Sequence, residues 1–293
     1  MLDRPVPNAL RAWLSIADGG ELGPDRLFST AEIAEQWLTW PDLVAGTYAE
    51  DPDWGAKEPP RDLLPIATDD EGNLRCLDLS SPGPEIVEWR RETAEITTLF
   101  RELDGWLVAA LRTVGLRFDS RGRPKPLRAG AEQAMPGDIE VHLSVEPDAS
   151  VPRLDRALWF RERGTPEDAL FAHREASAAW PPRAVNDWQH ALFALRTGRT
   201  TEARGAIRRA LSRPTCADPR KHSFRGGVLA AAHGLLAELY VDVGQVRKSD
   251  EQRALAERAA KKYGSDGYAE SDELQDALAL VKKGRRHQRR RGR

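Results

Sequence analysis

The sequence predicts an α+β domain, an antiparallel sheet with packed helices, followed by an all-α domain of helical repeats. Short apolar segments separated by turns rich in Gly, Pro and Asp lie between residues 63 and 89, which is typical of a sheet of short antiparallel strands. Between residues 151 and 281, apolar residues instead recur at helical spacing around regularly placed glycines. We therefore expect four parts: a domain at 1–118, a connecting segment at 119–150, helical repeats at 151–281 and a disordered basic tail at 282–293.

Two helices are expected ahead of the sheet. In segment 8–16 apolar residues recur at helical spacing, and Asp18–Gly20 ends the helix. A second helix begins after Ser29, because Glu32 three positions later completes a capping box. From residue 39 to 60 the chain is rich in Pro, Gly and Asp, and we expect an ordered loop there.

The expected sheet has three short strands joined by tight turns: 63–67, 74–79 and 86–89. After the sheet, apolar residues from Leu99 to Val114 recur at helical spacing, which predicts one long helix packed on the sheet. This helix is expected to close the domain near Phe118.

Several short motifs follow one another in a fixed order over about residues 5–115. They are Val6–Leu14, Asp18–Gly20, Leu64–Ala67, Asp70–Asn73, Cys76–Leu79 and Val87–Trp89. This order resembles the SUKH superfamily, which contains the Smi/Knr-type fungal cell-wall regulators and many bacterial immunity proteins. The resemblance implies a protein-binding protein that neutralises a toxin by occluding it rather than by chemistry.

The connecting segment contains one clean alternation. Ile139, Val141, Leu143 and Val145 are apolar, and the residues between them are polar. A period of two predicts a strand at 139–145, for which an edge of the N-terminal sheet is one available partner.

The second half of the chain repeats itself. Gly164, Gly198 and Gly244 align three units, and the first two glycines are 34 residues apart, the length of a tetratricopeptide repeat. Small residues recur at fixed distances from these glycines: Ala157, Ala191 and Ala237; Ala169, Ala203 and Ser249; Ala176, Ala210 and Ala256. Small side chains let helices pack closely, so we expect tetratricopeptide-like hairpins with an insertion around 214–222. The position nine residues after each glycine departs from the tetratricopeptide pattern, which has an aromatic residue there. In this chain the residues at that position are His173, Ile207 and Arg253.

Charge is divided unevenly along the chain, although the formal net charge is only −2. Residues 1–118 hold 11 basic and 22 acidic residues, a net of −11, whereas residues 119–281 hold 25 basic and 24 acidic residues. Nuclease-type and deaminase-type toxins must be basic to grip nucleic acid, so an acidic domain is suited to attract and cover one. The tail at 282–293 holds 8 basic and no acidic residues, which suits weak, non-specific nucleic-acid contact, folding back onto the acidic domain, or no dedicated partner.

No motif in the sequence supplies catalytic or metal chemistry. There is no phosphate-binding glycine loop, no His-Glu-x-x-His and no Gly-x-Ser-x-Gly. The six histidines are scattered, and Cys76 and Cys216 do not form a Cys-pair zinc motif or a disulfide framework. We therefore expect no enzyme activity, no cofactor and no metal site. Apolar runs fall short of the roughly 18–20 residues of a membrane span and no signal segment is recognisable, so we expect a cytoplasmic protein without membrane contact.

The candidate binding face is acidic. Asp69, Asp70 and Glu71 lie in an expected hairpin turn rather than a calcium loop, because the later glycine and the final Glu of such a loop are missing. Four further residues complete the face: Glu50, Asp51, Asp53 and Trp54. Together with Trp40 and Tyr48, Trp54 is also suited to anchor the expected loop in the core, and both interpretations stay open.

Two classes of function follow from these observations. The first is an immunity protein that neutralises a bacterial toxin of the nuclease or deaminase type by covering it. The alternative is a scaffold or regulatory adaptor of the Smi/Knr type, in which the concave groove of the helical repeats holds a peptide.

Overall fold

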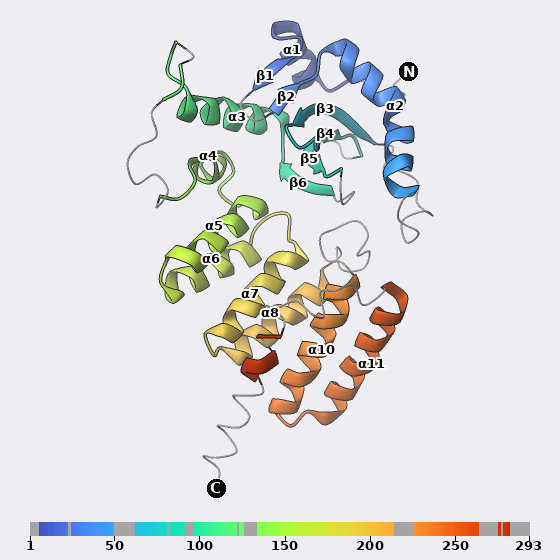
Figure 1. The fold of residues 1–293 in the computed structure, drawn as a ribbon, viewed down its shortest axis with the longest axis vertical. Coiled ribbons are helices and arrows are strands. Elements are labelled where there is room, and N and C mark those ends of the chain that lie inside the picture. The colour runs from blue at the N-terminus through green and yellow to red at the C-terminus, as the bar shows by residue number, and fades with distance from the viewer. Residues whose placement is uncertain are drawn as a thin grey trace. The chain divides into compact units, whose positions relative to one another are not determined.

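The computed structural model describes residues 6–22, 25–49, 62–80, 83–91, 96–121, 123–125, 134–213, 226–263, 275–276 and 278–281. The chain divides into two units, Met1–Pro152 and Arg153–Arg293 (Figure 1). The first unit combines an antiparallel sheet with helices, and the second is built of helices. The expected α+β fold with a helical C-terminal domain is confirmed.

The sheet of the first unit has six strands, and each strand pairs antiparallel with the next one along the chain. The strands are β1 (Gly20–Leu22), β2 (Asp25–Leu27), β3 (Leu63–Asp69), β4 (Leu74–Asp78), β5 (Glu85–Trp89) and β6 (Ile96–Phe100). The three expected strands are β3, β4 and β5. The sheet is thus twice as wide as the sequence pattern predicts, because β1, β2 and β6 extend it at both edges.

The first unit also contains helices α1 (Asn8–Ile16), α2 (Thr30–Ala49) and α3 (Leu103–Arg117), and α1 packs on α3. Helix α2 packs on β3, and α3 packs on β1, β5 and β6 (Figure 1). The expected capping box at the start of α2 is confirmed, since Ser29 N donates to Glu32 Oε2 at 2.8 Å and Glu32 N donates to Ser29 Oγ at 3.3 Å.

The loop expected from residue 39 is wrong in its first part, because α2 continues through Pro41 to Ala49. Proline normally ends a helix. Here Trp40 is buried with its ring edge-on to Trp89 of β5, at a centroid distance of 5.2 Å. Tertiary burial of this kind overrides a local breaker.

The long helix expected from Leu99 begins later than predicted. Leu99 and Phe100 belong to β6, where Phe100 pairs with Ile86, and α3 begins at Leu103. Short apolar runs fit a helical and a strand period equally well, so the pattern alone does not locate this boundary.

The strand expected at 139–145 is also wrong, because Gly137–Val145 forms helix α4. Its Val141 and Val145, four positions apart, pack on the core of the first unit. None of its residues is fully buried, so no apolar stripe at helical spacing stands out from the alternating pattern.

Helix α4 contacts the end of β6 through side chains rather than through backbone pairing. His142 Nε2 lies 3.1 Å from Leu99 O, and Glu146, just after the helix, accepts a hydrogen bond from Arg101 N at 2.8 Å. The His142 ring also stacks on Phe100, with the ring centroids 3.9 Å apart. The segment therefore meets the edge strand β6 as a helix, through side chains, in place of the strand pairing that the sequence left open.

Helix α5 (Ser150–Arg163) crosses the boundary between the units, and the second unit continues with α6 (Pro166–Ser177), α7 (Ala184–Arg196), α8 (Thr200–Ser212), α10 (Gly226–Asp242) and α11 (Val246–Tyr263). Helix α6 packs on α7, α7 on α8, α8 on α10 and α10 on α11 (Figure 1). Consecutive helices thus form antiparallel hairpins, and the assignment of these hairpins to tetratricopeptide repeats stays a prediction.

The three aligned glycines lie at the turns between paired helices. Gly198 and Gly244 adopt φ angles of +75° and +72°, which favour glycine. A Cβ on Gly164 would lie 2.9 Å from the backbone oxygen of Phe160, so a side chain there requires the backbone to shift. The recurring small residues are buried where the helices meet, except for the half-buried Ala256. In the part of the chain that the structure describes, no helix is long and apolar enough to cross a membrane.

Candidate protein-interaction site

The turn between β3 and β4 is held together by the first of its three acidic residues. Asp69 Oδ1 accepts hydrogen bonds from the backbone nitrogens of Glu71 and Asn73, at 3.0 and 2.9 Å, and Asp69 Oδ2 accepts one from Asn73 Nδ2 at 3.0 Å. Asp70 and Glu71 are exposed. The turn therefore presents two carboxylates to solvent and uses the third to fix its own shape.

Gly72 completes the turn with a φ of +80°. A Cβ there would meet its nearest atom, Arg91 NH1, at 3.8 Å, so space is available and only the backbone angle opposes a side chain. Gly72→Ala is expected to lower the unfolding free energy by about 1 kcal/mol, measured by urea unfolding. Gly83→Ala is the matched control, because a Cβ on Gly83 would have no atom within 4 Å and its φ is not positive. Equal losses in the two variants would contradict the role of the angle.

Arg75 of β4 lies between three carboxylates, and one of them belongs to the turn. Its Nε is 3.3 Å from Asp25 Oδ1, one terminal nitrogen is 3.3 Å from Asp69 Oδ2, and the other is 2.7 Å from Glu88 Oε1. Glu88 also accepts a hydrogen bond from Arg90 Nε at 2.8 Å. The acidic turn is thus tied through Arg75 to strands β2 and β5.

Asp25 is the most deeply buried carboxylate of this cluster. Burial raises its pKa above the ordinary value, and the nearby negative charges of Asp69 and Glu88 act in the same direction. Arg75 and a hydrogen bond from Trp106 oppose this shift without cancelling it. Arg75 is therefore the group that keeps three carboxylates compatible in one small volume.

The structure brings Asp69, Asp70 and Glu71 together in one turn, as expected. The other four predicted site residues lie outside the described residues: Glu50, Asp51, Asp53 and Trp54. Trp40 is buried against Trp89, so for this tryptophan the core interpretation applies. The described site is therefore the turn itself.

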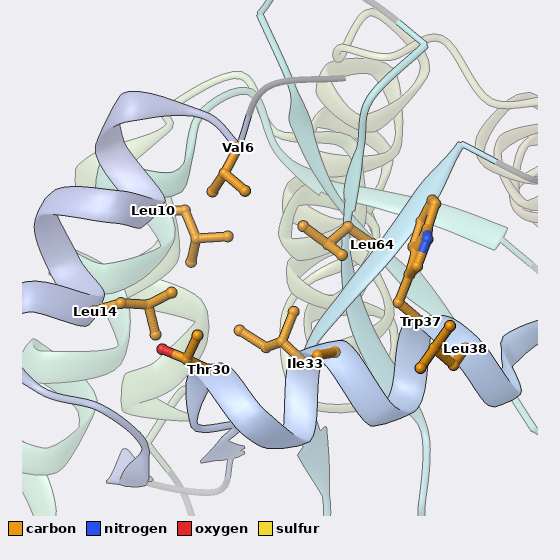
Figure 2. Close-up of a pocket in the computed structure, with 9 residues that line it drawn as sticks. Val6, Leu10, Leu14, Thr30, Ile33, Trp37, Leu38 and Leu64 are labelled. Carbon is orange, nitrogen blue, oxygen red and sulfur yellow. The ribbon is translucent and has the colours of Figure 1, made fainter. Parts of the chain in front are cut away.

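A groove that sequence analysis did not predict lies between α1 and α2, with β3 as its floor (Figure 2). Its volume is about 240 Å³. The lining residues are Val6, Leu10, Leu14, Thr30, Ile33, Ala34, Trp37, Leu38 and Leu64. All except Thr30 are apolar. In the sequence these positions are indistinguishable from an ordinary core stripe, so no local signal separates them from buried residues.

The turn, the Arg75 cluster and the groove all fall within one family match. Residues 1–109 match the model of the SMI1 / KNR4 family (SUKH-1). This part of the chain is a SUKH domain. A structural neighbour of the chain is the crystal structure of MamA, with 16% identity, a TM-score of 0.31, and coverage of 57% of this chain and 99% of that chain. The comparison with curated proteins finds no match.

The SUKH domain buries its thiol and exposes carboxylates at the turn. Cys76, its one cysteine, is fully buried in β4, and burial raises the pKa of the thiol, so the reactive thiolate is disfavoured. No group of three or more His, Cys, Asp or Glu in the described residues is placed to hold a metal ion. The exposed carboxylates of the turn are instead suited to accept hydrogen bonds from lysine or arginine.

Outside the SUKH domain, the helical unit contains a hydrogen-bond network of side chains that no sequence motif predicts. Ser177 Oγ lies 2.9 Å from His190 Nδ1, and His190 Nε2 lies 2.9 Å from Glu202 Oε1. Arg209 also approaches Nδ1, at 3.3 Å, and an arginine only donates, so Nε2 carries the proton and donates to Glu202. Both Ser177 and His190 are buried, so the Ser177 hydroxyl is not accessible to a substrate. The hydrogen-bond network links α6 to α7 and α8.

Next to this hydrogen-bond network, His173 is fully buried, and neither of its ring nitrogens has a hydrogen-bond partner among the described residues. Its ring stacks on Phe193, with the centroids 5.1 Å apart. Burial, assisted by the positive potential of His190 and Arg161, lowers the pKa of His173 to about 3. His173 is therefore a neutral ring that occupies an aromatic position.

Proposed function

We propose that this protein is an immunity protein that neutralises a basic bacterial toxin, of the nuclease or deaminase type, by covering its active site. The observation that supports this is the turn of the SUKH domain, where Asp70 and Glu71 are exposed and Asp69 fixes the backbone that carries them. A preorganised pair of carboxylates loses little conformational entropy on binding. Residues 1–118 carry a net charge of −11, which attracts a basic partner and speeds its association.

In this proposal the protein acts in the cytoplasm, where a toxin directed at nucleic acid meets its target, and it performs no reaction. Occlusion requires a complementary surface and neither a cofactor nor a metal ion. The function therefore depends on charge and shape at the turn.

The double variant Asp70→Lys/Glu71→Lys is expected to slow association with the toxin about tenfold or more at low ionic strength, because it reverses the charge of the turn. The toxin is first recovered from the native cell with the tagged wild-type chain and identified by mass spectrometry. Association rate constants are then measured by biolayer interferometry at several salt concentrations. One stoichiometric basic polypeptide, bound more weakly as salt rises, is the expected result.

The matched control is Asp250→Lys/Glu251→Lys, because these two neighbouring acidic residues of α11 are exposed and the charge change is the same. This control is expected to leave the rate constant nearly unchanged. Equal slowing by both double variants, or recovery of several unrelated proteins instead of one basic polypeptide, contradicts the proposal.

One observation favours the alternative of a scaffold or adaptor. Phe171 of α6 is 57% exposed on the helical unit, and an exposed aromatic side chain is a candidate anchor for another polypeptide. If the adaptor function is correct, the same recovery experiment yields several partners, and Phe171→Ser rather than the turn variant releases them.

A further inference from the structure

The groove between α1 and α2 has the features of a docking site, and the proposed contact through the turn does not use it. Apolar side chains from both helices point into it, and Leu64 of β3 closes its floor (Figure 2). Leu38 on its rim is 70% exposed. Protein interiors pack without empty spaces of about 240 Å³, and open apolar surface of this kind marks a binding site.

The spacing of the lining residues sets the length of the occupant. Thr30 and Leu38, the first and last lining residues of α2, are separated by about 12 Å along the helix, at 1.5 Å per residue. Across the groove, Leu10 and Leu14 are one turn apart on α1. Two turns of an amphipathic helix, with apolar residues three or four positions apart, match these dimensions.

Acidic residues stand at both ends of the groove. At one end, Asp18 Oδ1 accepts hydrogen bonds from Thr30 N at 2.6 Å and Thr30 Oγ1 at 2.7 Å, which place its charge beside the lining. These bonds lower the pKa of Asp18, so the carboxylate stays ionised. At the other end, Asp42 is exposed one helical turn beyond Leu38. Residues 6–49 hold 2 basic and 6 acidic residues, a net of −4.

The negative charge at the ends of the groove favours some possible occupants over others. A second copy of the chain brings the same acidic residues to the groove, so like charges oppose that contact. Residues 282–293 are basic but contain no apolar side chain to fill an apolar groove. A basic helix with an apolar face satisfies both the lining and the ends.

We infer that the groove binds an amphipathic helix of a partner protein, with two turns of apolar side chains flanked at both ends by lysine or arginine. The inference rests on the proposed function in one respect, that the partner is basic. The groove is then a second contact, where apolar burial slows dissociation after the acidic turn has sped association.

The test uses the full-length chain and three fluorescein-labelled peptides of about 16 residues, long enough for four helical turns. The first has leucines at i, i+3, i+4 and i+7 between lysine pairs, the second replaces the lysines with glutamates, and the third scrambles the leucine positions. Fluorescence anisotropy gives the dissociation constants for the wild type, for Leu38→Asp and for Ile16→Asp. Ile16 is the matched control, because it is an apolar residue of α1, 82% exposed, that does not line the groove.

The lysine-flanked amphipathic peptide is expected to bind at least about tenfold more tightly than the other two. Leu38→Asp is expected to weaken this binding about tenfold or more, and Ile16→Asp by less than about twofold. Equal binding of the three peptides, or equal effects of the two variants, overturns the inference. Dimerisation of the chain that Leu38→Asp abolishes, measured by sedimentation, overturns it as well by assigning the groove to a second copy. The toxin does not enter this test, so failure of the toxin proposal leaves the result interpretable.

Discussion

Replacing Arg75 with methionine is expected to lower the unfolding free energy of the SUKH domain by about 3–5 kcal/mol. Three carboxylates surround this guanidinium, whose side chain is only 12% exposed. Methionine replaces the aliphatic volume but leaves Asp25 and Asp69 without the counter-charge of Arg75, and Glu88 with Arg90 as its remaining ion-pair partner. Urea unfolding, combined with hydrogen exchange of the β3, β4 and β5 amides, measures the loss within this unit.

Arg26→Met is the control for this prediction, because Arg26 forms an exposed ion pair with Glu32. The unfolding free energy of this variant is expected to fall by less than about 1 kcal/mol, as is usual when an exposed ion pair is removed. Burial already raises the pKa of Asp25, and the Arg75 variant removes the positive charge that opposes this shift, so protonation of Asp25 favours folding and the loss shrinks as pH falls. A loss no greater than that of Arg26→Met, or one that grows on acidification, would count against the role assigned to Arg75.

Replacing His173 with phenylalanine is expected to stabilise the helical unit by about 1–3 kcal/mol at pH 7.5, because it removes a buried polar ring that lacks hydrogen-bond partners. The stabilisation by the phenylalanine variant, relative to the wild type, is larger at acidic pH. The pKa of His173 is about 3 in the folded state, against about 6.5 in an unfolded chain. The folded state therefore resists protonation, and the wild type loses stability as pH falls from about 6.5 toward 3.

At pH 5 this effect adds about 2 kcal/mol to the advantage of the phenylalanine variant, since each pH unit below 6.5 is worth about 1.4 kcal/mol. Thermal and urea unfolding at pH 7.5 and 5.0 measure both parts of the prediction. His173→Gln serves as the control, because it keeps a polar group in the same site and is expected to bring no stabilisation at pH 7.5. A phenylalanine variant that is less stable than the wild type, or equally sensitive to acid, is incompatible with an unpartnered ring.

The parts of the fold that the sequence pattern predicts correctly depend on neighbouring residues. The capping box at Ser29 and Glu32 needs only the geometry of one helix start. The turn glycines Gly198 and Gly244 need only a positive φ. Short apolar segments bounded by turn residues likewise suffice for β3, β4 and β5.

The errors arise where distant contacts decide the local conformation. Helix α2 passes Pro41 because Trp40 is buried on β5, and α4 is helical although its apolar residues alternate. Strands β1 and β2 have three residues each, too few to show a period of two.

The candidate site follows the same rule. Its acidic turn is visible in the sequence, because Asp69, Asp70 and Glu71 are neighbours in the chain. The sequence does not show that Asp69 fixes the shape of the turn, because this role depends on its contacts with Arg75 and Asn73. The groove requires α1, α2 and β3 to be assembled, so no single segment indicates it.

The order of the six strands also determines how the first unit forms. Each strand pairs with the one made just before it. The pairing of β2 with β3 spans α2 and the residues that follow it, with Asp25 opposite Asp69, whereas the four other pairings join strands that are close together in the chain. Loop closure between such neighbours costs little entropy, and a topology rich in local pairings folds quickly. The sheet can thus assemble strand by strand during translation, while the helical unit is still being synthesised. The acidic turn between β3 and β4 can form before the second half of the chain is synthesised, which suits the proposed immunity function.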